Sequence, residues 1–181
     1  MNLSNELKLP VFNRIGEIAD DMEREVYIVG GYVRDIFLKR HSSDIDFVTV
    51  GSGIELATEV AHRLNRGKGL SVFATYGTAQ VKLHDLELEF VGARKESYVR
   101  ESRNPIVENG TLEDDQNRRD FTINAMAISL NKERFGELVD PFDGIKDLEA
   151  RIIRTPLDPD IACSDDPWRL SVIHISEPTR R

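Results

Sequence analysis

The 181-residue sequence has one cysteine, one tryptophan and no long run of apolar residues. A single cysteine, Cys163, excludes an internal disulfide framework and is typical of a reducing compartment. No apolar stretch approaches the roughly 20 residues that cross a membrane, and the N-terminus lacks the basic-then-apolar pattern of a signal peptide. The four histidines are scattered, so they predict no zinc site. We therefore expect a cytoplasmic protein without a membrane segment.

Positive charge is also scarce. The 24 Lys and Arg residues face 32 Asp and Glu residues, which gives a formal net charge of −8. This balance argues against a generic basic coat protein for nucleic acid, although an enzyme can still hold nucleic acid through a local basic surface. Hydrophobic residues make up 40% of the chain and recur throughout, which excludes wholesale disorder and allows one sizeable core.

The hydrophobic periodicity alternates between helix and strand along the chain, as in an α/β protein. Helical spacing predicts helices over 11–22, 32–38, 54–64 and 118–130. Alternation and β-rich runs predict strands over 26–29, 44–50, 72–74, 78–83, 86–91 and 151–154. The polar stretch 94–117 has no clear period, so we expect it to form a mobile loop.

Two acidic residues, Asp44 and Asp46, lie two positions apart on a predicted strand. Residues i and i+2 of a strand point to the same face, so both carboxylates reach one point in space. Paired carboxylates suit Mg²⁺, which is usually held by one or two of them together with substrate phosphates. The alternative interpretation is a pair of solvated acids at the end of a strand.

Gly30 and Gly31 follow a buried strand and precede a helix. Glycines there allow the backbone to approach a phosphate, and the N-terminus of the helix offers unpaired N–H groups and partial positive charge. Arg34, one helical turn further on, reaches the same anion. The alternative is a tight turn followed by a surface pair of Arg34 with Asp35.

The spacing of these two features is more informative than either alone. Only 17 positions separate the start of the glycine turn, Gly30, from the end of the acidic pair, Asp46, counting both residues. If the two strands are neighbours, the phosphate cradle and the metal site face each other. Phosphoryl transfer needs this arrangement of a held triphosphate, a metal ion across it and an in-line nucleophile.

Four segments in a fixed order resemble the signature motifs of the class II tRNA nucleotidyltransferase and bacterial poly(A) polymerase family. They are GGYVRD (30–35), SDIDFV (43–48), RRDFTINAMA (118–127) and LVDPFDGIKDLEARIIRTP (138–156). The resemblance covers roughly residues 26–170. It implies a polymerase-β-like nucleotidyltransferase head, with a mixed sheet flanked by helices. It also implies Mg²⁺-dependent, template-independent addition of CMP and AMP, from CTP and ATP, to the 3′ end of tRNA.

The resemblance also implies roles for single residues. Asp44 and Asp46 would hold the catalytic magnesium ions, and Glu89 would be a third catalytic carboxylate; the alternative for Glu89 is an outward charge on an edge strand. The nucleotide-binding residues would be Gly30, Gly31, Arg34, Arg118, Arg119, Asp120 and Asn124. Guanidinium groups suit this role because they pair bidentately with phosphate oxygens. The alternative for Arg118 and Arg119 is a charge cluster at the start of a helix that balances Glu113, Asp114 and Asp115.

We expect residues 1–156 to form the head domain and 157–181 to begin a truncated helical neck. From about Ser171 the sequence SVIHISEPTRR no longer continues the family pattern, so we expect a non-native tail there. The family's base-selecting neck motif is absent from the given sequence. The head motifs leave other functions open: poly(A) polymerase, a split CC-adding or A-adding enzyme, or an inactive nucleotide-binding fragment. The expected partners are the tRNA 3′ end and nucleoside triphosphates.

Overall fold

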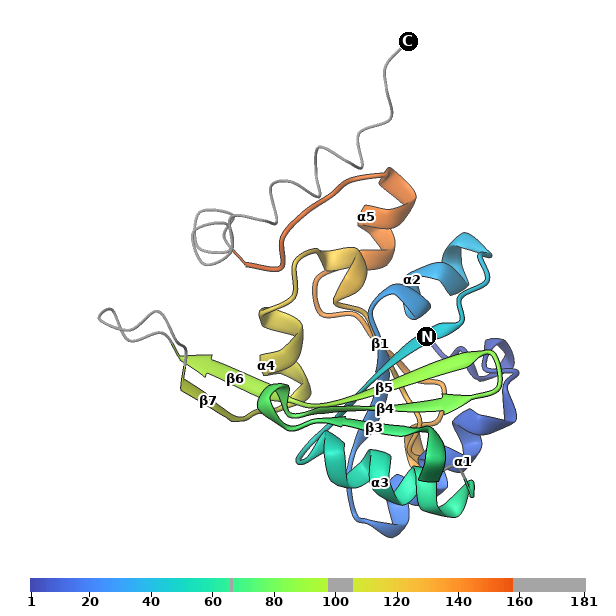
Figure 1. Cartoon of the computed structure of the whole chain (residues 1–181). Coiled ribbons are helices and arrows are strands. Elements are labelled where there is room, and N and C mark those ends of the chain that lie inside the picture. Colours follow the sequence, from blue (N-terminus) through green and yellow to red (C-terminus); the bar gives the residue numbers. More distant parts are fainter. Residues whose placement is uncertain (66, 98–105, 158–181) are drawn as a thin grey trace.

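A computed structural model describes residues 1–65, 67–97 and 106–157 of the chain (Figure 1). Its helices are α1 (Pro10–Asp21), α2 (Gly31–Leu38), α3 (Gly53–Arg63), α4 (Leu112–Asn117) and α5 (Gly144–Ala150). Its strands are β1 (Val26–Val29), β2 (Asp44–Thr49), β3 (Leu70–Phe73), β4 (Thr78–Leu83), β5 (Leu86–Gly92), β6 (Arg94–Ser97), β7 (Ile106–Asn109), β8 (Ala127–Ser129) and β9 (Leu138–Val139).

Seven of the strands form one mixed sheet in the order β3-β4-β5-β2-β1-β8-β9, and β6 pairs with β7 as a separate hairpin. β2 and β5 run parallel, whereas the other neighbouring pairs are antiparallel. The predicted mixed sheet flanked by helices is thus confirmed. Because β1 and β2 are neighbours, the residues that follow β1 lie next to those that begin β2.

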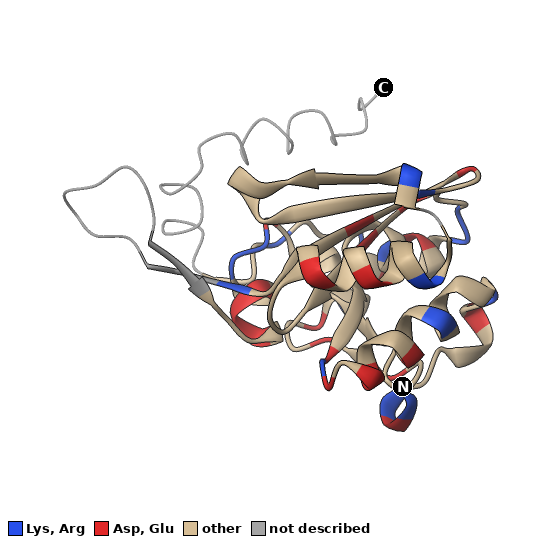
Figure 2. Cartoon of the chain, turned by 60° about the horizontal axis from the view of Figure 1, so that its bottom comes forward, with Lys and Arg blue, Asp and Glu red and all other residues tan. Residues whose placement is uncertain are grey.

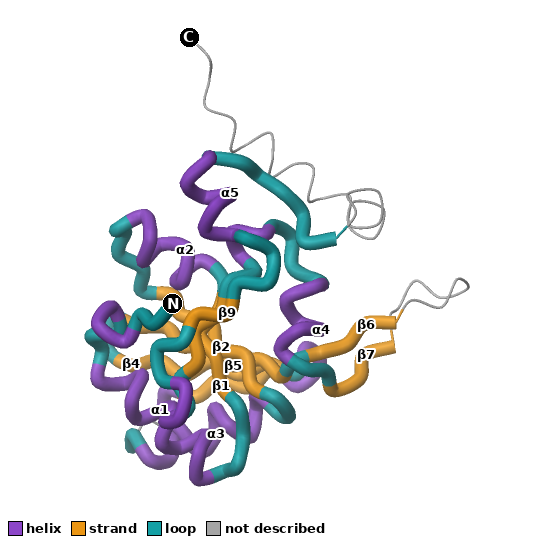
Figure 3. Tube along the Cα trace, turned by 180° about the vertical axis from the view of Figure 1, so that it is seen from behind, coloured by secondary structure: helices purple, strands orange, loops and turns teal. Residues whose placement is uncertain are grey.

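Helices α1 and α3 cover one face of the sheet (Figures 1 and 3). The apolar side chains of these helices and of the inward-facing strand positions form the main core, in which Phe12, Phe47 and Phe90 are fully buried. The rings of Phe47 and Phe90 stack with their centroids 4.8 Å apart across the parallel pair β2–β5. This packing fixes the strand that carries the two aspartates.

A smaller apolar cluster lies on the opposite face, where Leu112 of α4 packs near Tyr27, Val29 and Val48. Helix α4 begins at a capping box. The Thr111 side chain accepts a hydrogen bond from the Asp114 backbone N–H, and the Asp114 side chain accepts one from the Thr111 backbone N–H. The prediction of a mobile loop over 94–117 is therefore wrong for β6, β7 and α4. Residues 98–105 lie outside the described part.

The predicted strands 26–29, 44–50, 72–74, 78–83 and 86–91 and the first three predicted helices are confirmed to within a few residues. The prediction of a helix over 118–130 is wrong, because this stretch is a short 3₁₀ turn at Thr122–Asn124 followed by β8. Its apolar residues are buried by pairing between β1 and β9, so tertiary contacts override the helical spacing.

The structure assigns no strand to 151–154, contrary to prediction. Instead, the backbone of Arg154 accepts a single hydrogen bond from Thr122. The predicted neck beyond residue 157, the tail from Ser171 and Cys163 lie outside the described residues. No helix in the described part is long and apolar enough to cross a membrane.

Candidate active site

Asp44 and Asp46 begin β2 and point to the face of the sheet opposite the main core. Asp44 is exposed and Asp46 is half-buried, while Ile45 between them is fully buried in the core. The strand's period of two therefore produces the pair that the sequence predicts. Within the described part of the chain, neither carboxylate has a hydrogen-bond or ion-pair partner, so both remain available to a ligand.

Glu89 lies directly beside Asp46, because β5 pairs with β2 in a register that joins these two residues. Burial raises the pKa of Asp46; Arg119 opposes this shift, and Asp44 and Asp115 add to it. Burial also raises the pKa of Glu89, and the charge of Asp46 adds to that shift. Three acids thus share one patch in which Asp44 disfavours the ionisation of Asp46, and Asp46 that of Glu89, an arrangement that a bound cation would relieve.

Gly30 stands between β1 and α2 with φ of +73°, a left-handed conformation that favours glycine. A Cβ atom placed there would lie 3.2 Å from Oδ2 of Asp46 and 3.3 Å from Nη1 of Arg119. The glycine turn, the acidic pair and an arginine therefore converge on one point. Gly31 starts α2, and a Cβ on it would lie 3.5 Å from Nη2 of Arg34.

Arg34 is held from two sides. Its Nε donates to Oδ1 of Asp35 at 3.0 Å, and its Nη1 donates to Oδ1 of Asn124 at 3.0 Å. The amide of Asn124 donates in turn to Asp120 at 3.2 Å. The Arg34–Asp35 pair of the alternative interpretation is present, and it orients the guanidinium toward Asn124 of the third motif.

Asp115 is a residue of this site that the sequence analysis did not assign to it. It is fully buried on α4 and forms ion pairs with both Arg118 and Arg119, the latter at 2.9 Å. These partners lie three and four positions after it, the spacing at which side chains meet on a helix. That spacing is the signal that would have singled out Asp115. Both arginines thus balance an acid, and Arg119 also reaches toward Gly30 and Asp46.

The donor set fits a hard divalent cation. In the described residues, no three side chains of the acidic, histidine or cysteine types come together as a complete metal-binding group. Two carboxylates with free oxygens suit Mg²⁺, provided that substrate phosphates supply other ligands. The glycine turn, Arg34 and Arg119 offer donors for such phosphates on the adjacent side.

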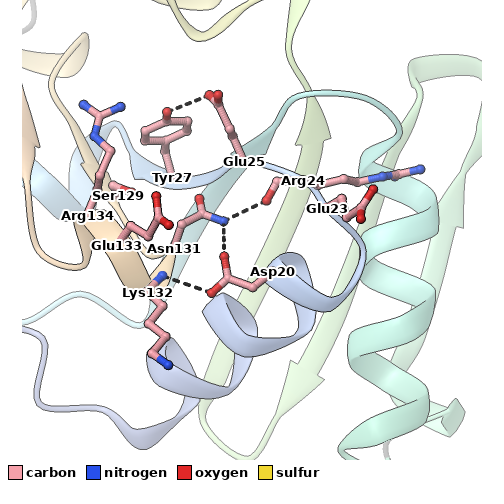
Figure 4. A pocket seen from close by; sticks show the side chains of 10 residues that line it. All are labelled: Asp20, Glu23, Arg24, Glu25, Tyr27, Ser129, Asn131, Lys132, Glu133 and Arg134. Carbon is pink, nitrogen blue, oxygen red and sulfur yellow. Dashed lines mark hydrogen bonds between the residues drawn. The ribbon is translucent and has the colours of Figure 1, made fainter.

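A hollow of about 460 Å³ lies at the other end of β1, away from the acidic patch (Figure 4). Its polar groups satisfy one another: Asn131 donates to Asp20 at 2.8 Å, and Tyr27 donates to Glu25 at 2.8 Å. Burial, with that hydrogen bond, raises the pKa of Tyr27 to about 12.

Acidic residues are distributed over most of the helices, with Lys and Arg scattered among them (Figure 2).

The mixed sheet carries the paired aspartates at the start of β2, with the glycine turn beside them. The family model described as the poly A polymerase head domain matches residues 26–154. The chain therefore belongs to the poly A polymerase head-domain family.

Named relatives agree with this assignment. The chain is 49% identical over 144 residues to an A-adding tRNA nucleotidyltransferase of Aquifex aeolicus, covering 80% of this chain and 17% of that protein. It is 37% identical to the A-adding tRNA nucleotidyltransferase of Halalkalibacterium halodurans, covering 90% of this chain and 37% of that protein. The chain thus spans well under half the length of these relatives.

Solved structures have the same fold. A CCA-adding enzyme in an apo form matches with a TM-score of 0.83 at 35% identity, over 94% of this chain and 41% of that one. A tRNA nucleotidyltransferase complexed with a primer tRNA and an ATP analogue matches with a TM-score of 0.73 at 44% identity, over 86% of this chain and 42% of that one. The expected fold class and family are confirmed.

Proposed function

We propose that the chain is the catalytic head of a template-independent nucleotidyltransferase that adds CMP and AMP to the 3′ end of tRNA. The observation that carries this proposal is the convergence of Gly30, Asp46 and Arg119 on one point beside Glu89. The names of the similar proteins supply the substrate class. We further propose that residues 1–156 form this head, that 157–181 begin a neck, and that the protein acts in the cytoplasm.

In the proposed reaction, the RNA 3′-hydroxyl attacks the α-phosphate of CTP or ATP, and pyrophosphate leaves. Gly30, Gly31, Arg34 and Arg119 hold the triphosphate through backbone N–H groups and guanidinium forks. Arg118, Asp120 and Asn124 orient these groups and the ribose. Asp44 and Asp46 would hold Mg²⁺, which when bound lowers the pKa of the attacking hydroxyl and neutralises charge on the phosphates. Glu89 acts as the third carboxylate, on the side of the incoming hydroxyl.

The test is incorporation of labelled CTP and ATP, with Mg²⁺, into tRNA that lacks its CCA end. We expect incorporation by the chain and its loss in the double variant Asp44→Ala/Asp46→Ala. Equal incorporation by both proteins would contradict the proposed metal site. Binding of labelled ATP with Mg²⁺ by the wild type alone, without incorporation, would reduce the proposal to a nucleotide-binding head.

A second candidate is addition of the terminal A alone. It is favoured by the names of the relatives at 49%, 40% and 37% identity, all of which are A-adding enzymes. Two tRNA substrates separate the candidates, one ending before CCA and one ending in CC. Extension of only the second, with ATP, supports A addition, whereas extension of both supports addition of the full CCA. Repeated ATP addition to a generic RNA would indicate a poly(A) polymerase.

A further inference from the structure

We propose that the open face of β3, β4 and β5 beside Glu89 binds the single-stranded 3′ end of the RNA primer. We call this surface the primer platform and define it by side chains that the register assigns to one face. They are Ser71, Phe73, Thr78, Gln80 and Lys82, together with Glu87, Glu89 and Val91 of β5. The inference rests on the proposed function, because it concerns the acceptor strand of the same reaction.

The strand register shows that the platform extends from the acidic patch toward the edge strand β3. Asp46 pairs with Glu89, Glu89 with Gln80, and Gln80 with Ser71. Directly paired residues share a face, so this row is one continuous line of polar side chains. A second row, from Val91 through Thr78 to Phe73, lies two residues further along. With strands about 4.8 Å apart, β3 lies roughly 14 Å from β2, the length of a few nucleotides.

The direction of the reaction assigns the occupant. Gly30 follows β1, and Arg119 precedes β8, so the phosphate-binding groups lie on the β1 side of Asp46. Attacking and leaving oxygens stand roughly in line across the transferred phosphorus. The hydroxyl must therefore approach from the opposite side, which is the side of β5 and Glu89. An RNA strand that ends there lies over β5, β4 and β3.

This part of the face is accessible. Helix α3 packs on the other face of these strands, against the buried Ala79 and Val81. On the platform side, the Lys82 side chain is 67% exposed and Phe73 is 46% exposed. Phe73 thus presents an exposed ring on the edge strand β3.

The side chains of the platform match a single RNA strand. Among the described residues, Lys82 pairs with Glu87 at 3.2 Å on the surface; such a pair contributes little and can exchange for a phosphate. The Gln80 amide donates to Glu87 at a long 3.3 Å and can likewise turn to a phosphate or ribose oxygen. Phe73 offers a flat ring at the far edge, on which a base can stack whatever its identity. With one cation, two acids and one ring, the platform binds RNA weakly, and only together with the site once it holds its cation.

The first experiment maps the RNA directly. A short RNA with 4-thiouridine at the third position from its 3′ end is irradiated with the 181-residue chain, Mg²⁺ and a non-hydrolysable ATP analogue. We expect the crosslinked peptides to come from residues 70–83. Crosslinks confined to α2 or α5, or none at all, would overturn the proposal. In the latter case the exposed Phe73 would indicate a protein partner instead.

The second experiment measures affinity for the same RNA, without thiouridine, by fluorescence anisotropy. Phe73→Ala should weaken binding about tenfold, because one base–aromatic stack is lost, and Phe73→Tyr should restore it. Val72→Ala is the matched control, since Val72 is 47% exposed on the same strand but belongs to the other face. Lys82→Ala should reduce the salt dependence of log K by about 0.7, the contribution of one phosphate contact on a single strand.

Failure of this inference is distinguishable from failure of the proposed function. Binding of the labelled ATP analogue with Mg²⁺ is measured on the same proteins without RNA. Wild-type nucleotide binding with equal RNA affinity in Phe73→Ala and Val72→Ala would overturn the platform and leave the proposed function standing. Loss of nucleotide binding in Phe73→Ala would also overturn it, because the platform lies on the side away from the triphosphate. Absence of nucleotide binding by the wild type would count against the proposed function.

Discussion

Asp46 is a carboxylate in a position that disfavours its own charge. Burial raises its pKa, and the neighbouring acids Asp44 and Asp115 add to the shift. A group whose pKa in the folded chain exceeds its unfolded value contributes stability below the unfolded pKa. That contribution is lost as pH rises through the folded pKa. At neutral pH, the metal-free protein therefore bears a cost at this residue, which is typical of a site prepared for a cation.

We predict opposite effects of Asp46→Asn on stability and on activity. Without metal at pH 7, the free energy of unfolding should rise, because a disfavoured charge is removed. The wild type loses stability as pH rises from the unfolded to the folded pKa of Asp46, and this loss should be smaller in the variant. Nucleotide transfer should fall about 100-fold or more, because several kcal/mol of metal-mediated stabilisation are lost. Urea denaturation across pH and single-turnover assays measure the two effects. Asp85→Asn, an exposed acid in the β4–β5 turn, should change neither. A loss of stability in Asp46→Asn would refute this account of the site.

Single residues were predictable where one local rule governs them. Alternation along β2 predicted that Asp44 and Asp46 share a face, whereas Glu89 was a candidate through the family resemblance. The register that brings Glu89 beside Asp46 is set by pairing between strands about 40 positions apart, which no local pattern contains. Asp115 was considered only as an acid that Arg118 and Arg119 could balance and was not assigned to the site, because it lies in a stretch that was predicted to be a loop.

At the scale of elements, α4 connects the second face of the sheet to the phosphate-binding arginines. Its capping box fixes where the helix begins, and Leu112 anchors it to the small apolar cluster. Asp115 then lies fully buried between Arg118 and Arg119. The segment after α4 explains why the predicted helix over 118–130 was wrong. Strand β8 is buried on both sides, and a strand buried in this way has a continuous apolar sequence, as a buried helix also does.

We predict that Asp115→Asn lowers the free energy of unfolding by about 3 kcal/mol, because a buried carboxylate between two guanidinium groups is lost. The affinity for ATP should fall as well, because Arg119 loses the partner that aims it at Gly30. Chemical denaturation and nucleotide titration measure these effects. Glu113→Gln, an exposed acid in the first turn of the same helix, is the matched control and should be nearly neutral. Equal stability of the two variants would mean that the buried pair is not needed for folding.

For the whole molecule, the fold class and the order of the motifs were predictable, because the alternation of helix and strand and the four signature segments are local in sequence. The packing of distant elements was not. Helix α1 crosses the sheet so closely that a Cβ on Gly16 would lie 2.1 Å from the carbonyl oxygen of Leu130, just after β8. More than 100 residues separate the two partners, so the sequence around Gly16 cannot predict this contact.

This contact gives a prediction of global stability. Alanine is favoured over glycine within a helix by about 1 kcal/mol, so propensity alone would make Gly16→Ala stabilising. The clash with Leu130 acts in the opposite direction, and overpacking of a rigid core costs about 1–3 kcal/mol. Backbone oxygen cannot move as a flexible side chain can, so we expect a net loss of stability, measured as a lower midpoint of thermal unfolding. Gly67→Ala is the control, because a Cβ there meets no atom within 4 Å, and its effect should stay within about 0.5 kcal/mol. If Gly16→Ala proved as stable as Gly67→Ala, the close approach of α1 to β8 would be wrong, and with it the packing that holds β1 and the glycine turn beside Asp46.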